Sequence, residues 1–191
     1  MSLNFPEGFD PQPTLMDDLL ELRPLTLDDR DALADAASDP AVWAGHPNKD
    51  RYRTDVFQPY FASLLAMGGC LVIVDRLTRD VIGCSAFYTD TNAPSRLSIG
   101  FTFLTCAYWG GPTNRALKRL MLEHIYALSA EAWFHIAPDN LRSQAATAKL
   151  GAVLMHEDTM DIGGGPQRWK CYCLTREAWT AAQSLPSRGG G

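Results

Sequence analysis

Three consecutive strand-like segments, followed by a glycine turn and a helix, constrain the fold of this chain most strongly. The segments CLVIVD, DVIGCSAFYTD and RLSIGFTFL lie within residues 70–104, and a short turn around RLTRD separates the first two. Runs rich in β-branched and aromatic residues, joined by short turns, are typical of antiparallel strands. The next stretch, YWGGPTNRALKRLM, changes to a helical repeat of apolar residues. We therefore expect an antiparallel meander that leads directly into a helix.

The other segments complete a mixed order of strands and helices. Pro59, inside an apolar helical pattern, predicts a kink or a join between two helices, and Gly68 and Gly69 predict the end of that helix. This order fits one α/β sheet with an antiparallel meander, a central parallel pair and flanking helices. The further expected elements are a strand at 19–25, helices at 26–38, 51–67 and 113–128, a strand at 132–137, a helix at 140–150, hairpin strands at 153–161 and 168–175, and a short helix at 176–185.

The length and composition fit a single domain. The chain has 191 residues, of which 46% are hydrophobic and 20% are charged, as in ordinary globular proteins. Residues 1–17, rich in proline and acid, are expected to form an extended arm, residues 18–182 one domain, and residues 183–191 a disordered tail.

Charge and cysteine content exclude several classes of function. A net charge of −5 and a pI of about 5.3 argue against nucleic-acid binding, which usually needs a basic surface. No run of eighteen apolar residues occurs, so no membrane span is expected. The five cysteines lie mostly in apolar runs without metal-ligand spacing, so we expect small core residues, no metal site and a reduced, cytoplasmic setting.

The glycine turn before the helix at 113–128 has features of an anion site. A helix N-terminus presents free N–H groups and a partial positive charge, and Gly110 and Gly111 would let a ligand approach the backbone closely. Acidic residues usually stabilise this end of a helix, but here Arg115, Lys118 and Arg119 stand there. The three cations either attract phosphate or are plain surface charges beside a loop that Thr113 or Asn114 caps.

Two long segments carry a family resemblance. RLSIGFTFLTCAYWGGPTNRALKRLMLEHIYAL and AWFHIAPDNLRSQAATAKLGA together resemble the acetyl-CoA core of the GNAT superfamily of N-acetyltransferases. The resemblance is nearest to the Rim-type branch, related to ribosomal-protein-alanine acetyltransferases, and spans about Leu22 to Trp179. It implies a GNAT-like sheet, acetyl-CoA as cosubstrate and an amine as acceptor.

The resemblance also implies which residues hold coenzyme A. In the family, the loop and helix start bind the pyrophosphate, the preceding strand pairs with the pantetheine amides, and an asparagine from the next strand end adds a hydrogen bond. Pro112 departs from the family loop, since proline lacks an N–H donor. The implied cofactor-binding residues are Phe101, Phe103, Leu104, Gly110, Gly111, Thr113, Asn114, Arg115, Lys118 and Asn140.

The resemblance implies fewer catalytic residues. Ser143 would donate a proton to the departing thiolate, although a first-turn serine can also simply bond the backbone. Related enzymes often carry a glutamate base where this chain has Ser98. The candidates for the base are then His135, Asp90, Glu157 or a water held by Ser98. For His135, the alternative is a purely structural role.

The segment before the meander is expected to supply core residues or an acceptor pocket. Its aromatic residues Trp43, Tyr52, Phe57 and Tyr60 recur at helical spacing, which favours the core. Arg51 and Arg53 are expected on a solvated face.

The expected function is direct acetyl transfer from acetyl-CoA to an amine of a protein N-terminus or a small molecule. A non-catalytic acyl-CoA sensor and a structural interaction protein are the alternatives. No membrane or nucleic-acid partner is expected, and a homodimer is among the states that the sequence allows.

Overall fold

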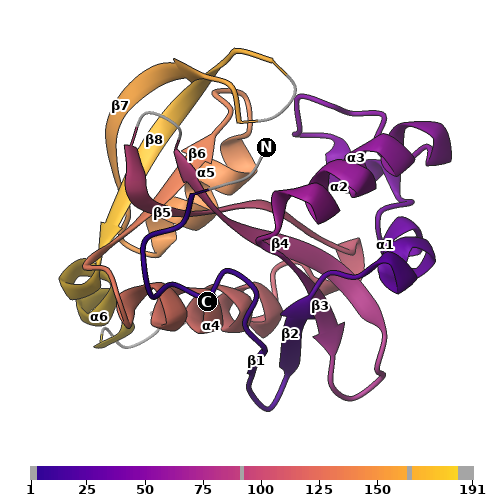
Figure 1. Cartoon of the computed structure of the whole chain (residues 1–191), viewed down its shortest axis with the longest axis horizontal. Helices are drawn as coiled ribbons and strands as arrows, with labels where there is room; N and C mark the ends of the chain where they lie inside the picture. The colour runs from indigo at the N-terminus through magenta and orange to yellow at the C-terminus, as the bar shows by residue number, and fades with distance from the viewer. Residues whose placement is uncertain (1–3, 91–92, 163–164, 185–191) are drawn as a thin grey trace, which may run out of the picture.

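One mixed sheet of eight strands organises the molecule (Figure 1). The computed structural model describes residues 4–90, 93–162 and 165–184. The strand order is β1-β2-β3-β4-β5-β6-β8-β7, and β5 and β6 are the parallel neighbours. The strands are β1 (Leu15–Met16), β2 (Leu20–Pro24), β3 (Cys70–Asp75), β4 (Val81–Asp90), β5 (Ala93–Leu104), β6 (Glu131–Ile136), β7 (Val153–Met160) and β8 (Gln167–Thr175).

The predicted meander and closing hairpin are confirmed. Strands β3, β4 and β5 pair in antiparallel succession, and β7 pairs with β8 in the same sense. Nearly all of β4 is buried, because helices cover both faces of the sheet. The predicted mixed α/β sheet, with its meander and parallel pair, is therefore the observed fold.

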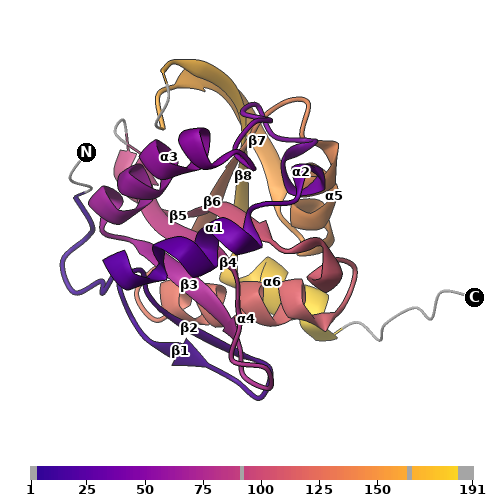
Figure 2. The same ribbon diagram turned by 90° about the vertical axis from the view of Figure 1, so that its right-hand side faces the viewer.

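Helices cover the two faces of the sheet unequally (Figures 1 and 2). The helices before the meander pack on one face, in a core cluster that includes Trp43, Phe57 and Phe103. Helix α4 packs on the other face, where Leu117 and Met121 are fully buried, and Trp179 of α6 adds to that core. The helices are α1 (Arg30–Ala36), α2 (Pro40–Trp43), α3 (Thr54–Met67), α4 (Pro112–Tyr126), α5 (Leu141–Lys149) and α6 (Arg176–Ser184).

Helix α3 is one continuous helix, although Pro59 lies inside it. The predicted join between two helices is therefore wrong. An interior proline costs about 3 kcal/mol. Burial of Phe57, Tyr60 and Leu64, each stabilising by roughly 1.5–3 kcal/mol, is large enough to offset that cost. The helix ends as expected, at Gly68 in the left-handed conformation.

The N-terminal segment packs against α4. Phe9 is buried in the core and contacts Phe87 edge-on, at 5.3 Å between ring centroids. Leu15 and Met16 pair with β2. Of the segment expected as a disordered tail, residues 183 and 184 belong to α6, and residues 185–191 lie outside the described part of the chain.

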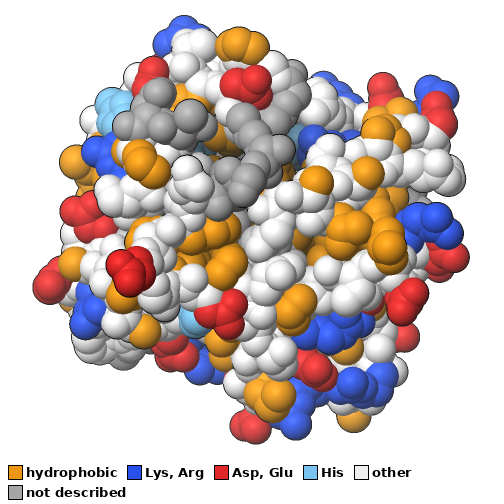
Figure 3. All heavy atoms as spheres, viewed as in Figure 1, with side chains coloured by type: hydrophobic (Ala, Val, Ile, Leu, Met, Phe, Trp, Pro, Cys, Tyr) orange, Lys and Arg blue, Asp and Glu red, His pale blue; other side chains and the backbone are white. Residues whose placement is uncertain are grey.

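Figure 3 shows one face of the molecule with its side chains coloured by type. Acidic and basic side chains are interspersed over this face, with apolar side chains between them. Among the described helices, none is long and apolar enough to cross a membrane.

Gly83 of β4 tests how closely β4 and β5 approach. A Cβ there would stand 2.1 Å from the Phe103 carbonyl oxygen, and its φ of +154° disfavours side chains. We expect Gly83→Ala to lower the free energy of unfolding by about 3 kcal/mol or more. Gly68→Ala, whose Cβ would meet nothing within 4 Å, should cost only about 1–2 kcal/mol. Urea unfolding followed by circular dichroism measures both, and equal losses would contradict the predicted close approach.

Candidate functional site

The parallel strands β5 and β6 are paired at one point and separate beyond it. Ser98 opposite Trp133 is their pairing position among the described residues. A bulge in β5 follows, since Cys84 pairs with Phe103 and Ala86 with Gly100, which leaves two β5 residues opposite one in β4. Phe101 in this bulge has a φ of +53°, uncommon for a residue with a side chain and frequent at functional sites. The second half of β5 therefore presents backbone groups that β6 does not use.

Lys118 of α4 lies beneath this separation. Its Nζ donates to Thr102 Oγ1 of β5 at 3.2 Å and lies 5.7 Å from the Phe134 ring of β6. Loss of water around the ammonium lowers the pKa of Lys118 from 10.5 to about 8. The Lys118 side chain thus reaches both strands, so it would lie beside any extended ligand that occupied the space between them.

The glycine turn leaves backbone donors free at the start of α4. Gly110 has a φ of +71°, Gly111 is the N-cap, and Pro112 occupies the first turn. No side chain caps this end, and within the described residues neither glycine N–H has a hydrogen-bond acceptor. A Cβ on either glycine would meet nothing within 4 Å, so the space above the turn is open. Free N–H groups, open space and the helix dipole together are the features of a candidate anion site.

The three cations of the opening turns of α4 do not act together. Arg119 forms an ion pair with Asp17 at 2.6 Å, and a second, longer one with Glu123. Lys118 is directed at the strands, so the exposed Arg115 is the cation of the three that stays available beside the glycines. Arg119 is therefore paired with acids, Lys118 contacts the strands, and phosphate binding beside Arg115 stays a prediction.

Arg142 is a further cation that sequence analysis did not select. Its guanidinium lies 3.9 Å from the centroid of the Trp109 ring in the turn, and it donates to the Val42 carbonyl. The same Trp109 donates its indole N–H to the Leu104 carbonyl at 2.9 Å. Arg142 thus brings positive charge from α5 to the glycine turn, and its position directly before Ser143 was the available signal.

Asn140 and Ser143 meet at the start of α5. The Asn140 side-chain oxygen accepts the Ser143 N–H at 3.1 Å, so Asn140 is the N-cap that the sequence predicts. The Asn140 amide NH₂ remains for a ligand. Ser143 Oγ is partly exposed and has no hydrogen-bond partner among the described residues.

Two of the implied strand residues place their side chains in the protein core. Phe103 is buried and packs against Trp43, with ring centroids 5.1 Å apart. Leu104 is also buried, and Thr113 of α4 is nearly so. Phe103 and Leu104 can contact a cofactor only through backbone groups, and the Leu104 carbonyl already accepts from Trp109.

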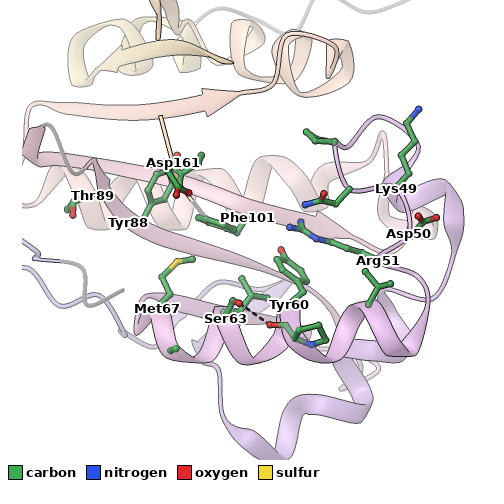
Figure 4. Close-up of a pocket in the computed structure, with 17 residues that line it drawn as sticks. Lys49, Asp50, Arg51, Tyr60, Ser63, Met67, Tyr88, Thr89, Phe101 and Asp161 are labelled. Carbon is green, nitrogen blue, oxygen red and sulfur yellow. Dashed lines mark hydrogen bonds between the residues drawn. The ribbon is translucent and has the colours of Figure 1, made fainter. Parts of the chain in front are cut away.

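A cavity of about 860 Å³ lies on the α3 side of the sheet and reaches the β5 bulge (Figure 4). Tyr88 and Phe101 come from the sheet, Arg51 from the loop before α3, and Tyr60 from α3 itself. Asp161, which follows β7, also lines the cavity. The expected aromatic segment is thus divided: Tyr60 lines the cavity, whereas Trp43 and Phe57 are core residues and Tyr52 is exposed.

Tyr88 and His135 form the polar pair at the sheet side of this cavity. The Tyr88 hydroxyl and His135 Nδ1 are 2.7 Å apart. Burial raises the pKa of Tyr88, and burial lowers the pKa of His135 from 6.5 to about 4, although Asp90 opposes the latter effect. Both groups are therefore neutral near pH 7.

The strand residues around Tyr88 leave room for its ring. A Cβ at Gly100 would stand 2.7 Å from Tyr88 Cε1, so only glycine fits there without moving the ring. Ser98 is paired with Tyr88 across the strands, and its buried hydroxyl has no hydrogen bond of normal geometry among the described residues. Ser98 thus stands next to the Tyr88–His135 pair.

The other base candidates lie less favourably. Glu157 forms an ion pair with Arg168 at 2.5 Å on the exposed hairpin. Asp90 is buried at the end of β4, near enough to His135 to affect its pKa. Within the described residues no group of three acidic, histidine or cysteine side chains could hold a metal ion.

Comparison with known proteins identifies the family and supports the fold. Residues 20–153 match the family model described as acetyltransferase (GNAT) domain, whereas no curated protein matches the chain. A GCN5-related N-acetyltransferase from Brucella melitensis has a TM-score of 0.75 at 14% identity, covering 93% of this chain and 87% of that chain. A probable acetyltransferase from Chromobacterium violaceum has a TM-score of 0.75 at 17% identity, covering 91% of each chain.

A third similar structure was solved with a cofactor derivative. It is RimJ from Mycobacterium smegmatis in complex with CoA-disulfide, with a TM-score of 0.61 at 19% identity over 86% of each chain. GNAT acetyltransferases use acetyl-CoA. Because the family model covers most of the sequence and the fold agrees, this chain belongs to the GNAT acetyltransferase domain family.

Proposed function

We propose that this protein is an N-acetyltransferase that transfers an acetyl group from acetyl-CoA directly to an amine. The observation that carries the proposal is the continuity of two features. The β5 edge that is free of β6 runs from Ser98 to Leu104, where Trp109 of the glycine turn bonds the Leu104 carbonyl, and Phe101 in the bulge of the same edge lines the cavity. A cofactor seated in the opening would present its thioester to an acceptor in the cavity.

The cofactor is proposed to use the groups that the structure leaves free. The N–H groups of Gly110, Gly111 and the first turn of α4, which holds Thr113 and Asn114, would bind the pyrophosphate, assisted by Arg115. The free edge of β5 beyond Ser98 would pair with the pantetheine amides, with Lys118 beneath it and the Asn140 amide NH₂ at the far side. The missing N–H of Pro112 matters little, because the glycines before it supply donors.

The chemistry requires a neutral amine and two proton transfers. The amine nitrogen attacks the acetyl carbonyl, the tetrahedral intermediate expels the thiolate, and Ser143 Oγ supplies the proton that the thiolate takes up. The proton lost by nitrogen passes to the Tyr88 oxygen while Tyr88 passes its own to His135 Nδ1, in the tautomer with hydrogen on Nε2. Because the pKa of His135 is low, this pair acts as a relay toward solvent rather than as a strong base.

A non-catalytic acyl-CoA sensor is the second candidate function. The residue at the family's usual glutamate position is Ser98, and its hydroxyl is buried beside a phenol and an imidazole that are both neutral. An α-amine, with a pKa of about 7.7–8.0, needs less help to lose its proton than a lysine amine, with a pKa of about 10.4. For the proposed transfer, the weak base therefore favours an acceptor with an α-amine, as in the Rim-type branch.

Product formation tests the proposal. Mass spectrometry of acetylated products, with acetyl-CoA and a panel of α-amines and lysine-type amines, should detect enzyme-dependent acetylation of α-amines. We expect Ser143→Ala to lower kcat on the order of 100-fold while the KM for acetyl-CoA changes little. Ser184→Ala, on the exposed end of α6, is the matched control and should be unchanged.

Two outcomes would contradict this account in different ways. Unchanged turnover in Ser143→Ala removes Ser143 from the mechanism. Binding of acetyl-CoA without product from any amine supports the sensor instead.

His135 should make the fold sensitive to acid. Because folding lowers its pKa from 6.5 to about 4, the unfolded chain binds more protons between these values, and stability is lost as pH falls below 6.5. From pH 7 to pH 5 the expected contribution is about 2 kcal/mol, which His135→Gln should remove. His46, whose pKa burial also lowers to about 4, should behave alike. Urea titrations at the two pH values check this, and an equal pH-dependent loss in wild type and His135→Gln would refute it.

A further inference from the structure

Arg51 is a buried cation inside the acceptor cavity. The sequence predicted it on a solvated face together with Arg53, and for Arg53 that holds: it is exposed and pairs with Asp55 at 3.1 Å. Arg51 is instead only 9% exposed and lines the cavity. In Figure 4 its side chain extends from the loop into the space between Tyr60 and Phe101. The prediction for Arg51 was wrong because sequence spacing does not reveal which arginine the loop turns inward.

Aromatic rings hold the Arg51 guanidinium in place. Its Cζ lies 3.6 Å from the centroid of the Tyr60 ring and 5.5 Å from that of Trp43. Stacking of this kind covers a face of the planar group and leaves the N–H donors at its edge directed outward. The guanidinium is therefore fixed in orientation before any ligand arrives.

Within the described residues, no carboxylate forms an ion pair with Arg51. Its one hydrogen-bond contact there joins Nη1 to His46 Nε2 at 3.2 Å. The Asn48 N–H approaches the other ring nitrogen of His46 at 3.1 Å. A neutral imidazole accepts through one nitrogen only, so His46 cannot satisfy both donors, and it supplies no negative charge.

The acidic residues at the cavity do not neutralise Arg51. Asp50 is exposed, Asp161 accepts the Gly165 N–H at 3.2 Å, and neither carboxylate contributes to the pKa shift of Arg51. Burial lowers the pKa of Arg51, and the positive charge in turn helps to lower that of His46. Burial of a cation without a counter-ion costs free energy, and an anionic ligand that paired with Arg51 would recover part of that cost.

We propose that Arg51 binds a carboxylate of the acceptor, so that the preferred acceptors carry an amine together with a carboxylate. The inference rests on the proposed acetyl transfer, because it names the acceptor class of that cavity. A planar guanidinium with free edge donors matches a carboxylate through two parallel hydrogen bonds. One buried cation balances one negative charge, which suits a carboxylate better than a doubly charged phosphate.

Two kinds of acceptor supply this chemistry. A free amino acid carries its own α-carboxylate, and a peptide that begins with aspartate or glutamate carries a side-chain carboxylate near its α-amine. Matched pairs separate the two sources: leucine against leucinamide and phenylalanine against phenylalaninamide for the first, and tripeptide amides beginning with Glu against those beginning with Gln for the second.

The test compares kcat/KM for these pairs in wild type, Arg51→Met, Arg51→Lys and the exposed control Arg53→Met. Wild type and Arg53→Met should prefer the carboxylate member of at least one pair on the order of 100-fold, whereas Arg51→Met should lose the preference. Arg51→Lys keeps the positive charge but cannot donate two parallel hydrogen bonds, so it should retain part of the preference for the carboxylate. Circular dichroism and thermal unfolding identify a variant that fails to fold, in which case Arg51→Lys carries the comparison.

Several results would overturn the proposal. Equal use of both members of every pair by wild type, or a preference that persists in Arg51→Met, excludes a carboxylate at Arg51. An equal loss of kcat for all acceptors would place Arg51 at the thioester instead. If no acceptor is acetylated, the proposed acetyl transfer fails, and calorimetric titration with the same pairs tests the carboxylate site on its own. Selective binding of the carboxylate members that Arg51→Met abolishes supports the site, and the absence of such binding rejects it.

Discussion

The separation of β5 from β6 after a single point of pairing is the constraint on which the rest of the site depends. Parallel strands that stayed paired would satisfy their backbone groups with each other and leave no edge for a ligand. Here the pairing at Ser98 and Trp133 is followed by the bulge at Phe101. Helix α4 is held beneath both strands, and the glycine turn that starts it stands close to the end of the free β5 edge. One irregularity in the sheet thus connects the proposed phosphate site with the proposed acceptor cavity.

Strands β4, β5 and β6 set the positions of the side chains around the bulge relative to one another. Gly100 makes room for the Tyr88 ring, and Tyr88 meets His135 from β6. Both lie on the side of the sheet where α3 encloses the cavity, whereas Lys118 approaches from the opposite side. In the proposed function, the cofactor and the acceptor would reach the bulge from opposite sides, which suits direct transfer without an enzyme intermediate.

Local signals were sufficient for most of the fold. The glycine stop at Gly68, the cap at Asn140 and the three-strand meander all depend on residues close in sequence, and the structure has each of them. Of the two outcomes predicted at Pro59, the join between two helices is absent because the burial of its neighbours, a tertiary effect, keeps α3 continuous.

The side-chain environment of the site depended instead on contacts between distant segments. Arg119 forms an ion pair with Asp17, about one hundred residues away in the chain. Arg142 stacks on Trp109 from another helix, and Arg51 turns into the cavity because Trp43 and Tyr60 accommodate it. No spacing rule encodes these encounters, so the cations were the residues that sequence analysis placed least well.

A crystal structure with acetyl-CoA is the most direct test of the claim that the β5–β6 separation is the cofactor site. The account predicts the pyrophosphate at the N–H groups of Gly110 and Gly111, pantetheine amides paired with β5 beyond Ser98, and the acetyl group at the Phe101 bulge, facing Tyr88. Pantetheine bound elsewhere, or a bound cofactor that leaves the free edge of β5 empty, would contradict it.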